Sequence, residues 1–171
     1  GAVFTDNDEW AALADSYRVH GKGMFKYDNV RIGMNSRLDT LQAAILKIKF
    51  KAFHEYELRD INKAAALYTG KLSGKVKTPV VPEGYYSSWA QYTIRLDSKE
   101  ERDALQARLK EQGIPSMVYY PTPMHGQTAY KTLNVPDDCC PVARELCDTV
   151  LSLPIHPYIT EEDIETVSSH I

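Results

Sequence analysis

The sequence predicts an α/β fold in which helices pack on a small sheet, and three observations lead to this prediction. Apolar and polar residues alternate over residues 88–96, which is the pattern of a half-buried strand. A helical pattern follows over residues 99–112, and a second strand candidate follows it over 114–120. With 171 residues, the chain is long enough for one domain with attached remnants.

The start of the chain is expected to form a strand and then a short helix. Residues 1–5 have a strand-like composition, and polar residues 5–9 supply helix N-cap candidates and early acidic charge. The helix should run to about Val19 and stop near Gly21. Since the chain starts inside this strand and without Met, we expect it to be a piece of a larger protein.

An irregular loop is expected over residues 21–33, because this stretch is rich in Gly, Asp, Asn and Lys. Its large side chains, Met24, Phe25 and Tyr27, would serve as anchors or as part of an interface.

Residues 37–70 are predicted to form one long connecting helix. Apolar residues recur there at helical spacing, with charged residues between them, at Leu38, Leu41, Ala44, Ile45 and Ile48. The pattern continues to Tyr68 and is expected to stop at Gly70, which gives a rod of roughly 45 Å at 1.5 Å per residue. A helix of this length typically bridges two structural units.

The remaining residues complete the predicted α/β layer. Residues 71–84 are rich in Lys, Pro and Gly, which indicates a linker with room for one edge strand. Ser98 is the predicted N-cap of the helix over 99–112, and Gly113 is its predicted stop.

Further elements are expected near the end of the chain. A helix should begin at Asp137 or Asp138 and run to Leu151, and a short strand should follow over 151–155. Thr160 should open the last helix, with Asp163 at the capping-box position.

Composition excludes several classes of function. The 20 basic and 23 acidic residues give a formal charge of -3 and are finely interspersed, so nucleic acid is not an expected partner. No apolar run is long enough to cross a membrane, so we expect a soluble protein. The cysteines, Cys139, Cys140 and Cys147, are odd in number and share one short segment, which favours the cytoplasm over a secreted disulfide framework.

Self-contained catalytic and metal sites are not predicted. The five histidines are isolated from one another in the sequence, and the adjacent Cys139 and Cys140 are poorly placed to chelate one ion, so we expect no metal site. No nucleophile elbow, Walker loop or Gly-x-Gly-x-x-Gly motif occurs.

The loop over residues 33–39 is the best candidate for binding chemistry. It places an amide, a guanidinium and a carboxylate, those of Asn35, Arg37 and Asp39, at the start of a helix. An amide and a helix N-terminus both suit an anionic oxygen such as that of a phosphate. Taken alone, the same residues are more typical of a helix cap with a surface pair between Arg37 and Asp39, and both interpretations stay open.

Five ordered segments carry a resemblance to a known family. They are residues 1–5 (GAVFT), 33–44 (GMNSRLDTLQAA), 89–95 (WAQYTIR), 118–125 (VYYPTPMH) and 152–158 (SLPIHPY). With these segments the chain resembles the C-terminal portion of the DegT/DnrJ/EryC1/StrS sugar aminotransferases. These are pyridoxal-phosphate (PLP) enzymes of fold type I.

The resemblance implies three regions within the chain. Residues 1–36 would be a remnant of the large PLP-binding domain, 37–70 the connecting helix and 71–171 the C-terminal small domain.

The resemblance also implies roles for particular residues in a homodimer with composite active sites. Asn35 would reach the phosphate of pyridoxal 5'-phosphate bound by the partner subunit, and Arg37 would lie at the same site and hold substrate or cofactor. Tyr120 could orient the sugar or pack at a strand end. His125 could line the nucleotide-sugar pocket or be structural. Tyr119 stands where the family pattern has a histidine.

The family's Schiff-base lysine would lie upstream of Gly1, so no catalytic residue is expected here and this chain alone is predicted to be inactive. The full-length enzyme would transfer an amino group, with glutamate as the expected donor, to a nucleotide-linked keto sugar for surface glycan or glycosylated-metabolite biosynthesis. Two alternatives stay open. One is a sugar dehydratase of the same family with histidine in place of the lysine, and the other is a non-enzymatic α/β dimerisation module.

Overall fold

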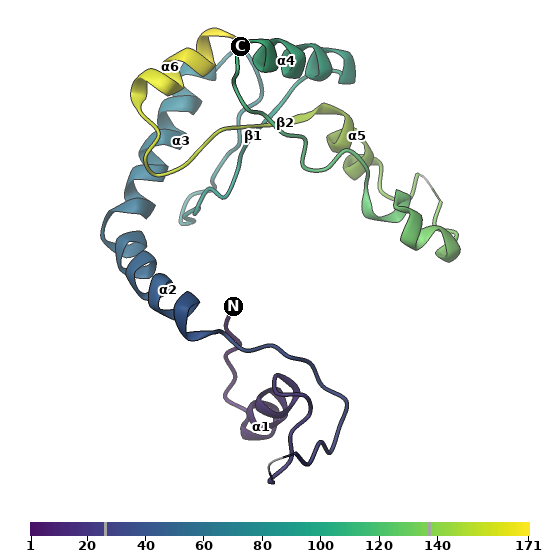
Figure 1. The fold of residues 1–171 in the computed structure, drawn as a ribbon. Coiled ribbons are helices and arrows are strands. Elements are labelled where there is room, and N and C mark those ends of the chain that lie inside the picture. Colours follow the sequence, from purple (N-terminus) through teal and green to yellow (C-terminus); the bar gives the residue numbers. More distant parts are fainter. Residues whose placement is uncertain (26, 137) are drawn as a thin grey trace. The chain divides into compact units, whose positions relative to one another are not determined.

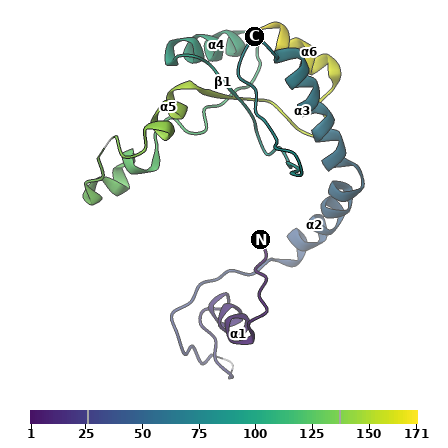
Figure 2. The same ribbon diagram turned by 180° about the vertical axis from the view of Figure 1, so that it is seen from behind.

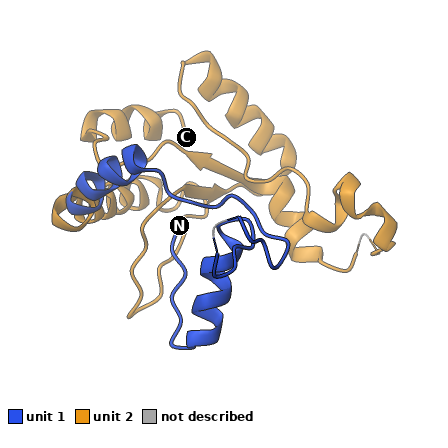
Figure 3. Cartoon of the chain, turned by 60° about the horizontal axis from the view of Figure 1, so that its bottom comes forward, with its two compact units in different colours: residues 1–51 blue, residues 52–171 orange. Residues whose placement is uncertain are grey.

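The computed structural model describes residues 1–25, 27–136 and 138–171. These residues form two compact units, Gly1–Lys51 (unit 1) and Ala52–Ile171 (unit 2), which Figure 3 colours separately. The boundary falls inside the helical run that follows residue 40. The three regions expected from the sequence, with boundaries at 36 and 70, stay a prediction about the whole protein.

Unit 1 begins with an irregular segment and one helix, α1 (Asp8–Tyr17). Asn7 caps this helix, because its side-chain oxygen accepts a hydrogen bond of 3.0 Å from the Trp10 amide. The helix ends two residues before the predicted end at Val19. The backbone turns left-handed directly afterwards, at His20 and Gly21.

The strand predicted over residues 1–5 is wrong, since these residues have no regular secondary structure. A strand needs a neighbouring backbone to pair with, and no described segment pairs with residues 1–5. Their apolar, β-branched composition therefore indicates strand propensity, but it does not supply a strand to pair with.

The predicted long helix consists of three consecutive helical segments. These are α2 (Thr40–Ala52), the π-helical segment η1 (Phe53–Glu57) and α3 (Leu58–Leu72). The run starts at Thr40 because the Asp39 carboxylate accepts a hydrogen bond of 2.9 Å from the Gln42 amide. It passes through Gly70, the predicted stop, and ends where Ser73 leaves the helical conformation and Gly74 adopts φ +81°.

Unit 2 is built on an antiparallel pair of strands, β1 (Tyr92–Arg95) and β2 (Val150–Leu153). Isolated bridges add one residue at each edge: Lys77 pairs with Arg95 of β1, and Met117 pairs with Ser152 of β2. The predicted edge strand in the linker is thus reduced to a single bridge.

The chain segment between β1 and β2 contains the helices α4 (Lys99–Glu111) and α5 (Pro141–Thr149). Ser98 caps α4 and Gly113 follows it with φ +71°, as predicted. The predicted helix before Leu151 starts later, at Pro141, and stops at Thr149, where the chain becomes β2. Of the two predicted starts, Asp138 is not helical and Asp137 lies outside the described residues.

The second strand predicted after α4, over residues 114–120, is wrong. Only Met117 pairs with the sheet, through hydrogen bonds of 3.1 and 2.8 Å with Ser152. Pro115 and Pro121 lack the amide hydrogen that a longer ladder needs. The partner of β1 is therefore β2, which is much later in the sequence, and the pair is antiparallel.

The core of unit 2 lies between the sheet and three helices. Figures 1 and 2 show α3, α4 and α6 (Glu161–Ser169) gathered over one side of β1 and β2. The largest fully buried side chains come from all five elements: Tyr68, Leu72, Tyr92, Ile94, Leu109, Leu151 and Ile164. The predicted capping box of the last helix is confirmed, because Thr160 and Asp163 exchange hydrogen bonds between side chain and backbone.

Two short 3-10 segments complete unit 2. They are η2 (Met124–Gly126) and η3 (Thr128–Leu133), which precede α5. In the described part of the chain, no helix has the length and apolar character that a membrane crossing requires.

Candidate functional site

The loop that carries Asn35 is held against the end of α1 by backbone hydrogen bonds. Met34 donates to the Tyr17 carbonyl at 2.8 Å, and Ser36 donates to the Arg18 carbonyl at 2.9 Å. Between them, Asn35 forms a bridge with Val19. The backbone on both sides of the Asn35 side chain is therefore fixed, although the side chain itself is exposed.

Two glycines allow this close arrangement of loop and helix. A Cβ at Gly33 would collide with the backbone of His20 and Gly21, and a Cβ at Gly21 would collide with the Arg31 carbonyl. Gly21 also has φ +76°, which favours glycine. The irregular loop predicted over 21–33 is confirmed for residues 21–25 and 27–33, and Gly21 and Gly33 have a structural reason.

Asn35 and Arg37 form a hydrogen-bonded pair with several exposed donors. Arg37 Nε donates to Asn35 Oδ1 at 3.1 Å, so the amide oxygen is occupied. The amide hydrogens of Asn35 and the remaining guanidinium hydrogens of Arg37 have no acceptor among the described residues. An exposed cluster of donors that includes a positive charge can bind an anionic oxygen.

Asp39 does not pair with Arg37. Its carboxylate caps α2 through the Gln42 amide, and Arg37 contacts Asn35 instead. The surface pair between Arg37 and Asp39, which the sequence left open, is therefore wrong. The helix cap that the sequence also left open is provided by Asp39. The donors of Asn35 and Arg37 are left without a neighbouring carboxylate in a hydrogen bond or ion pair.

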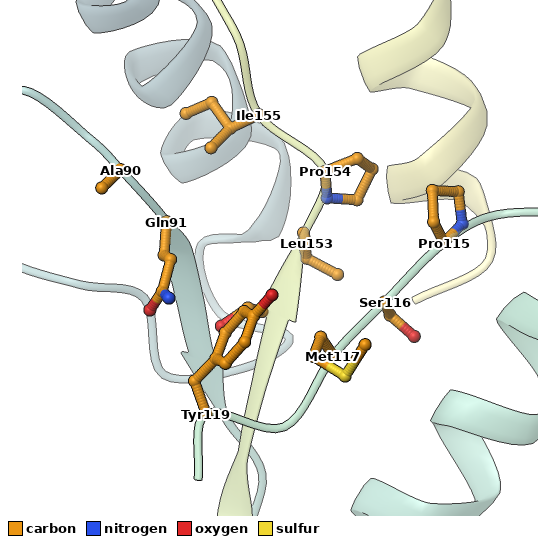
Figure 4. A pocket seen from close by; sticks show the side chains of 10 residues that line it. Ala90, Gln91, Pro115, Ser116, Met117, Tyr119, Leu153, Pro154 and Ile155 are labelled. Atoms are coloured by element: carbon orange, nitrogen blue, oxygen red, sulfur yellow. The ribbon is translucent and has the colours of Figure 1, made fainter. Parts of the chain in front are cut away.

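The other predicted site residues lie in unit 2. Tyr120 is exposed and packs edge-to-face with Tyr119, at 5.6 Å between ring centroids. Tyr119 lines a cavity of about 300 Å³ at the edge of the sheet, whereas Tyr120 is not among the residues that line it. Figure 4 shows Tyr119 with Gln91 and Met117 around Leu153 of β2.

Buried tyrosines hold one wall of this cavity. The hydroxyl of Tyr68 donates to the carbonyl of Pro154 at 3.0 Å, and the hydroxyl of Tyr92 lies 2.8 Å from that of Thr69. Burial raises the pKa of both tyrosines, because it disfavours the charged phenolate. Pro154 lines the cavity, so its position depends on the core.

Sequence analysis missed Glu57, a buried carboxylate that is only 5% exposed. It lies in the π-helical segment η1 and accepts a hydrogen bond from the hydroxyl of Tyr158. Segments of this kind often occur at functional positions. A residue pattern read as one uniform helix gives no signal for it.

His156 stabilises the turn that follows β2. Its Nδ1 accepts a hydrogen bond of 3.2 Å from the Tyr158 amide. Arg95 of β1 forms an ion pair with Glu145 of α5.

His125 lies on η2 and is half-buried. The structure brings it to the side chains of Cys139 and Cys140, and the potential ligand atoms of all three lie within 4.8 Å of one another. The sequence considered the histidines and the cysteine pair separately and gave no signal for this cluster, because the chain folds back between them.

Comparison with known proteins places these observations in a family. A sequence model of the DegT/DnrJ/EryC1/StrS aminotransferase family matches residues 1–171. The chain is 39% identical over 170 residues to the UDP-2-acetamido-2-deoxy-3-oxo-D-glucuronate aminotransferase of Pseudomonas aeruginosa, covering 98% of this chain and 45% of that protein. It is 36% identical over 172 residues to the UDP-N-acetyl-3-dehydro-alpha-D-glucosamine 3-aminotransferase of Acidithiobacillus ferrooxidans, covering 100% of this chain and 45% of that protein.

Solved structures agree with the sequence comparison. A DegT DnrJ EryC1 StrS aminotransferase from Brucella abortus superposes with a TM-score of 0.89 at 44% identity, covering 98% of this chain and 44% of that one. DesV of S. venezuelae superposes with a TM-score of 0.88 at 31% identity, covering 97% and 44%. The predicted fold class is confirmed, and the chain spans less than half the length of the relatives it matches.

Proposed function

Because this chain belongs to the DegT/DnrJ/EryC1/StrS aminotransferase family, whose members use pyridoxal 5'-phosphate, we propose that the whole protein transfers an amino group to a nucleotide-linked keto sugar. The names of the two curated relatives describe aminotransferases that act on UDP-linked sugars. Glutamate is the proposed amino donor, and the amino sugar would serve surface glycan or glycosylated-metabolite biosynthesis in the cytoplasm.

The observation that carries the proposal is the donor pair of Asn35 and Arg37. The hydrogen bond between them engages the Asn35 amide oxygen and leaves the amide hydrogens of Asn35 and the other guanidinium hydrogens of Arg37 exposed on a fixed backbone. A phosphate accepts several hydrogen bonds, and its donors include neutral and charged groups of this kind. The residues present therefore fit the phosphate of the cofactor.

Within this assignment Asn35 binds the cofactor phosphate and Arg37 contacts substrate at the same site. When bound, the cofactor supplies an electron sink that allows an amino group to move between an amino acid and a keto group. The chain's own residues bind and orient, and we assign none of them a catalytic role. The proposed Schiff-base lysine lies upstream of Gly1, so this chain alone should be inactive.

A homodimer would bring Asn35 to a partner's cofactor. Support for a partner copy comes from α2, whose apolar residues are exposed in this chain: Leu41 is 80% and Ile48 73% exposed. A contiguous apolar surface of this kind is typical of an interface between subunits. The loop residues Met24, Phe25 and Tyr27 are also exposed and would belong to the same interface.

Tyr120 is the proposed sugar contact in unit 2, because its hydroxyl is exposed at the end of the segment that borders the sheet. The sugar contact expected of His125 has less support, since its ring lies in the cluster with Cys139 and Cys140.

The proposal is tested by an amination assay of the whole protein with glutamate and a panel of UDP- and dTDP-linked keto sugars. Formation of an amino sugar with one of them is the expected result. Dehydration of the sugar without amino transfer would assign the protein to the dehydratases instead. The chain of 171 residues, given the same cofactor and substrates, should show no turnover.

A further inference from the structure

Three potential metal ligands from two separate stretches of unit 2 meet beside the start of α5. They are His125 on η2 and the adjacent residues Cys139 and Cys140, and Cys140 is the N-cap of α5. Their ligand atoms all lie within 4.8 Å of one another, and the two sulfur atoms are 3.5 Å apart. Two sulfur ligands and one imidazole are a donor set that thiophilic metal ions prefer.

The distances match those around a metal ion better than those of a disulfide. Tetrahedral Zn²⁺ with Zn–S bonds of about 2.3 Å and a Zn–N bond of about 2.0 Å separates two sulfurs by about 3.8 Å and sulfur from nitrogen by about 3.5 Å. The sulfur atoms of Cys139 and Cys140, at 3.5 Å, are close to this separation. A disulfide would require a separation of about 2.05 Å.

His125 offers an independent indication. Its Nε2 atom is buried and makes no hydrogen bond within the described part of the chain. A buried polar atom without a partner is uncommon in folded proteins and costs free energy. A metal ion is one of the two partners, beside a hydrogen-bonding group, that an imidazole nitrogen ordinarily takes.

The surrounding segment also buries little of its surface. No residue of 127–136 or 138–145 is buried, although this stretch contains η3 and the first half of α5. Short segments that bury little apolar surface are often held by a structural metal ion. An ion bound by the three residues would join η2 to the start of α5.

We propose that His125, Cys139 and Cys140 bind one thiophilic divalent metal ion of the Zn²⁺ type. Each thiol releases its proton to solvent as its sulfur coordinates the ion, and the imidazole coordinates in its neutral form. Two thiolates balance the charge of the ion, and the fourth coordination position is filled by water. This site goes beyond the proposed amino transfer, which does not require it.

The site is tested with the whole protein, fully reduced and stripped of metal by a chelator. Titration with Zn²⁺ against a chromophoric competitor gives the affinity and the number of ions per chain. Titration with Cd²⁺ reports sulfur ligands directly, through the thiolate-to-metal charge-transfer absorption. We expect one ion per chain at this site and a charge-transfer band that grows until that ion is bound.

Single substitutions identify the ligands, and the third cysteine supplies the control. Cys139→Ser and Cys140→Ser should each weaken Zn²⁺ binding more than about tenfold, since even the loss of a ligand's own hydrogen-bond partner costs 10- to 100-fold. His125→Asn should weaken it similarly while leaving the Cd²⁺–thiolate band present. Cys147→Ser, which changes a half-buried cysteine of α5 outside the cluster, should bind as the wild type does.

Two results would overturn the site. One is unchanged Zn²⁺ affinity in both Cys139→Ser and Cys140→Ser, with circular dichroism showing that the variants are folded. The other is a reduced protein that binds no ion and whose peptide containing Cys139 and Cys140 becomes two hydrogens lighter in air, which would identify the pair as a disulfide. Neither result would affect the amination assay, so this proposal and the proposed function fail separately.

Discussion

Unit 1 and unit 2 use similar proportions of apolar residues in different ways. All of the buried apolar side chains in the described chain belong to unit 2, where α3, α4 and α6 cover the sheet. In unit 1 the apolar residues of α2 are exposed, and the folded loop is held by backbone hydrogen bonds to α1. An apolar pattern thus predicts that a face will be covered, but it does not say what covers it.

The comparison is tested most strongly by shortening one leucine in each unit. Leu151→Ala, at a fully buried residue of β2, should lower the free energy of unfolding by about 3 kcal/mol, because it leaves a cavity in the core. Leu41→Ala, at a residue that is 80% exposed, should change it by less than about 0.5 kcal/mol. Urea unfolding of the 171-residue chain, followed by circular dichroism, measures both. Equal losses would mean that α2 is packed within the chain.

A second test asks whether a partner copy covers α2. Ile45→Asp places a charge on the exposed apolar face and should raise the dimer dissociation constant of the whole protein more than about 100-fold, or about 2.7 kcal/mol. Val80→Asp changes an apolar residue of unit 2 that is 84% exposed and serves as the matched control. Light scattering over a dilution series measures the mass. A dimer that survives Ile45→Asp unchanged would place the interface elsewhere.

A third test concerns the hydrogen-bond donors of Asn35 in unit 1. Asn35→Ala removes a neutral donor to a charged phosphate and should weaken cofactor binding by about 2 kcal/mol, or roughly 30-fold. Ser36→Ala leaves the backbone hydrogen bond from Ser36 to Arg18 in place and should bind the cofactor normally. Fluorescence titration of the whole protein with pyridoxal phosphate compares the two. Wild-type affinity in Asn35→Ala would remove Asn35 from the cofactor site.

The smallest expected effect is an acid dependence confined to unit 2. Hydrogen bonds from the Thr160 side chain and backbone hold the pKa of the Asp163 carboxyl below its usual range. A group with a depressed folded pKa contributes stability above its unfolded pKa of about 3.9, and this is lost as the pH falls through the folded value.

Wild type should therefore melt at a higher temperature than Asp163→Asn at pH 7. The difference should shrink to nothing in strong acid, as shown by thermal melts over a pH series. A difference that stays constant with pH would assign the effect to packing instead of charge.

Local signals in the sequence were sufficient for several elements. Ser98 before α4 and the pair of Thr160 and Asp163 before α6 predicted the starts of both helices, because a cap is satisfied within three residues. Non-local pairing was not predictable in the same way. Residues 114–120 have the composition of a strand but pair at Met117 alone, and β1 pairs with β2 across more than fifty residues.

The candidate site shows the same division. The sequence placed Asn35 and Arg37 in one loop at a helix start, since both residues and the helix signal are close together in the chain. The hydrogen bond between them, which engages the Asn35 amide oxygen and leaves the donors exposed, is a matter of side-chain geometry. The sequence left open a surface pair between Arg37 and Asp39. In the structure the Asp39 carboxylate caps α2 instead.

The sequence alone determined the family, the capped helices and the candidate residues for the proposed phosphate contact, because these depend on short-range patterns of residue type. The tertiary structure decided which strand pairs with which, that Tyr119 and not Tyr120 lines the cavity, and that His125 meets Cys139 and Cys140. The reason is that loop closure and packing bring together residues that are far apart in the sequence, and their spacing does not predict the contact.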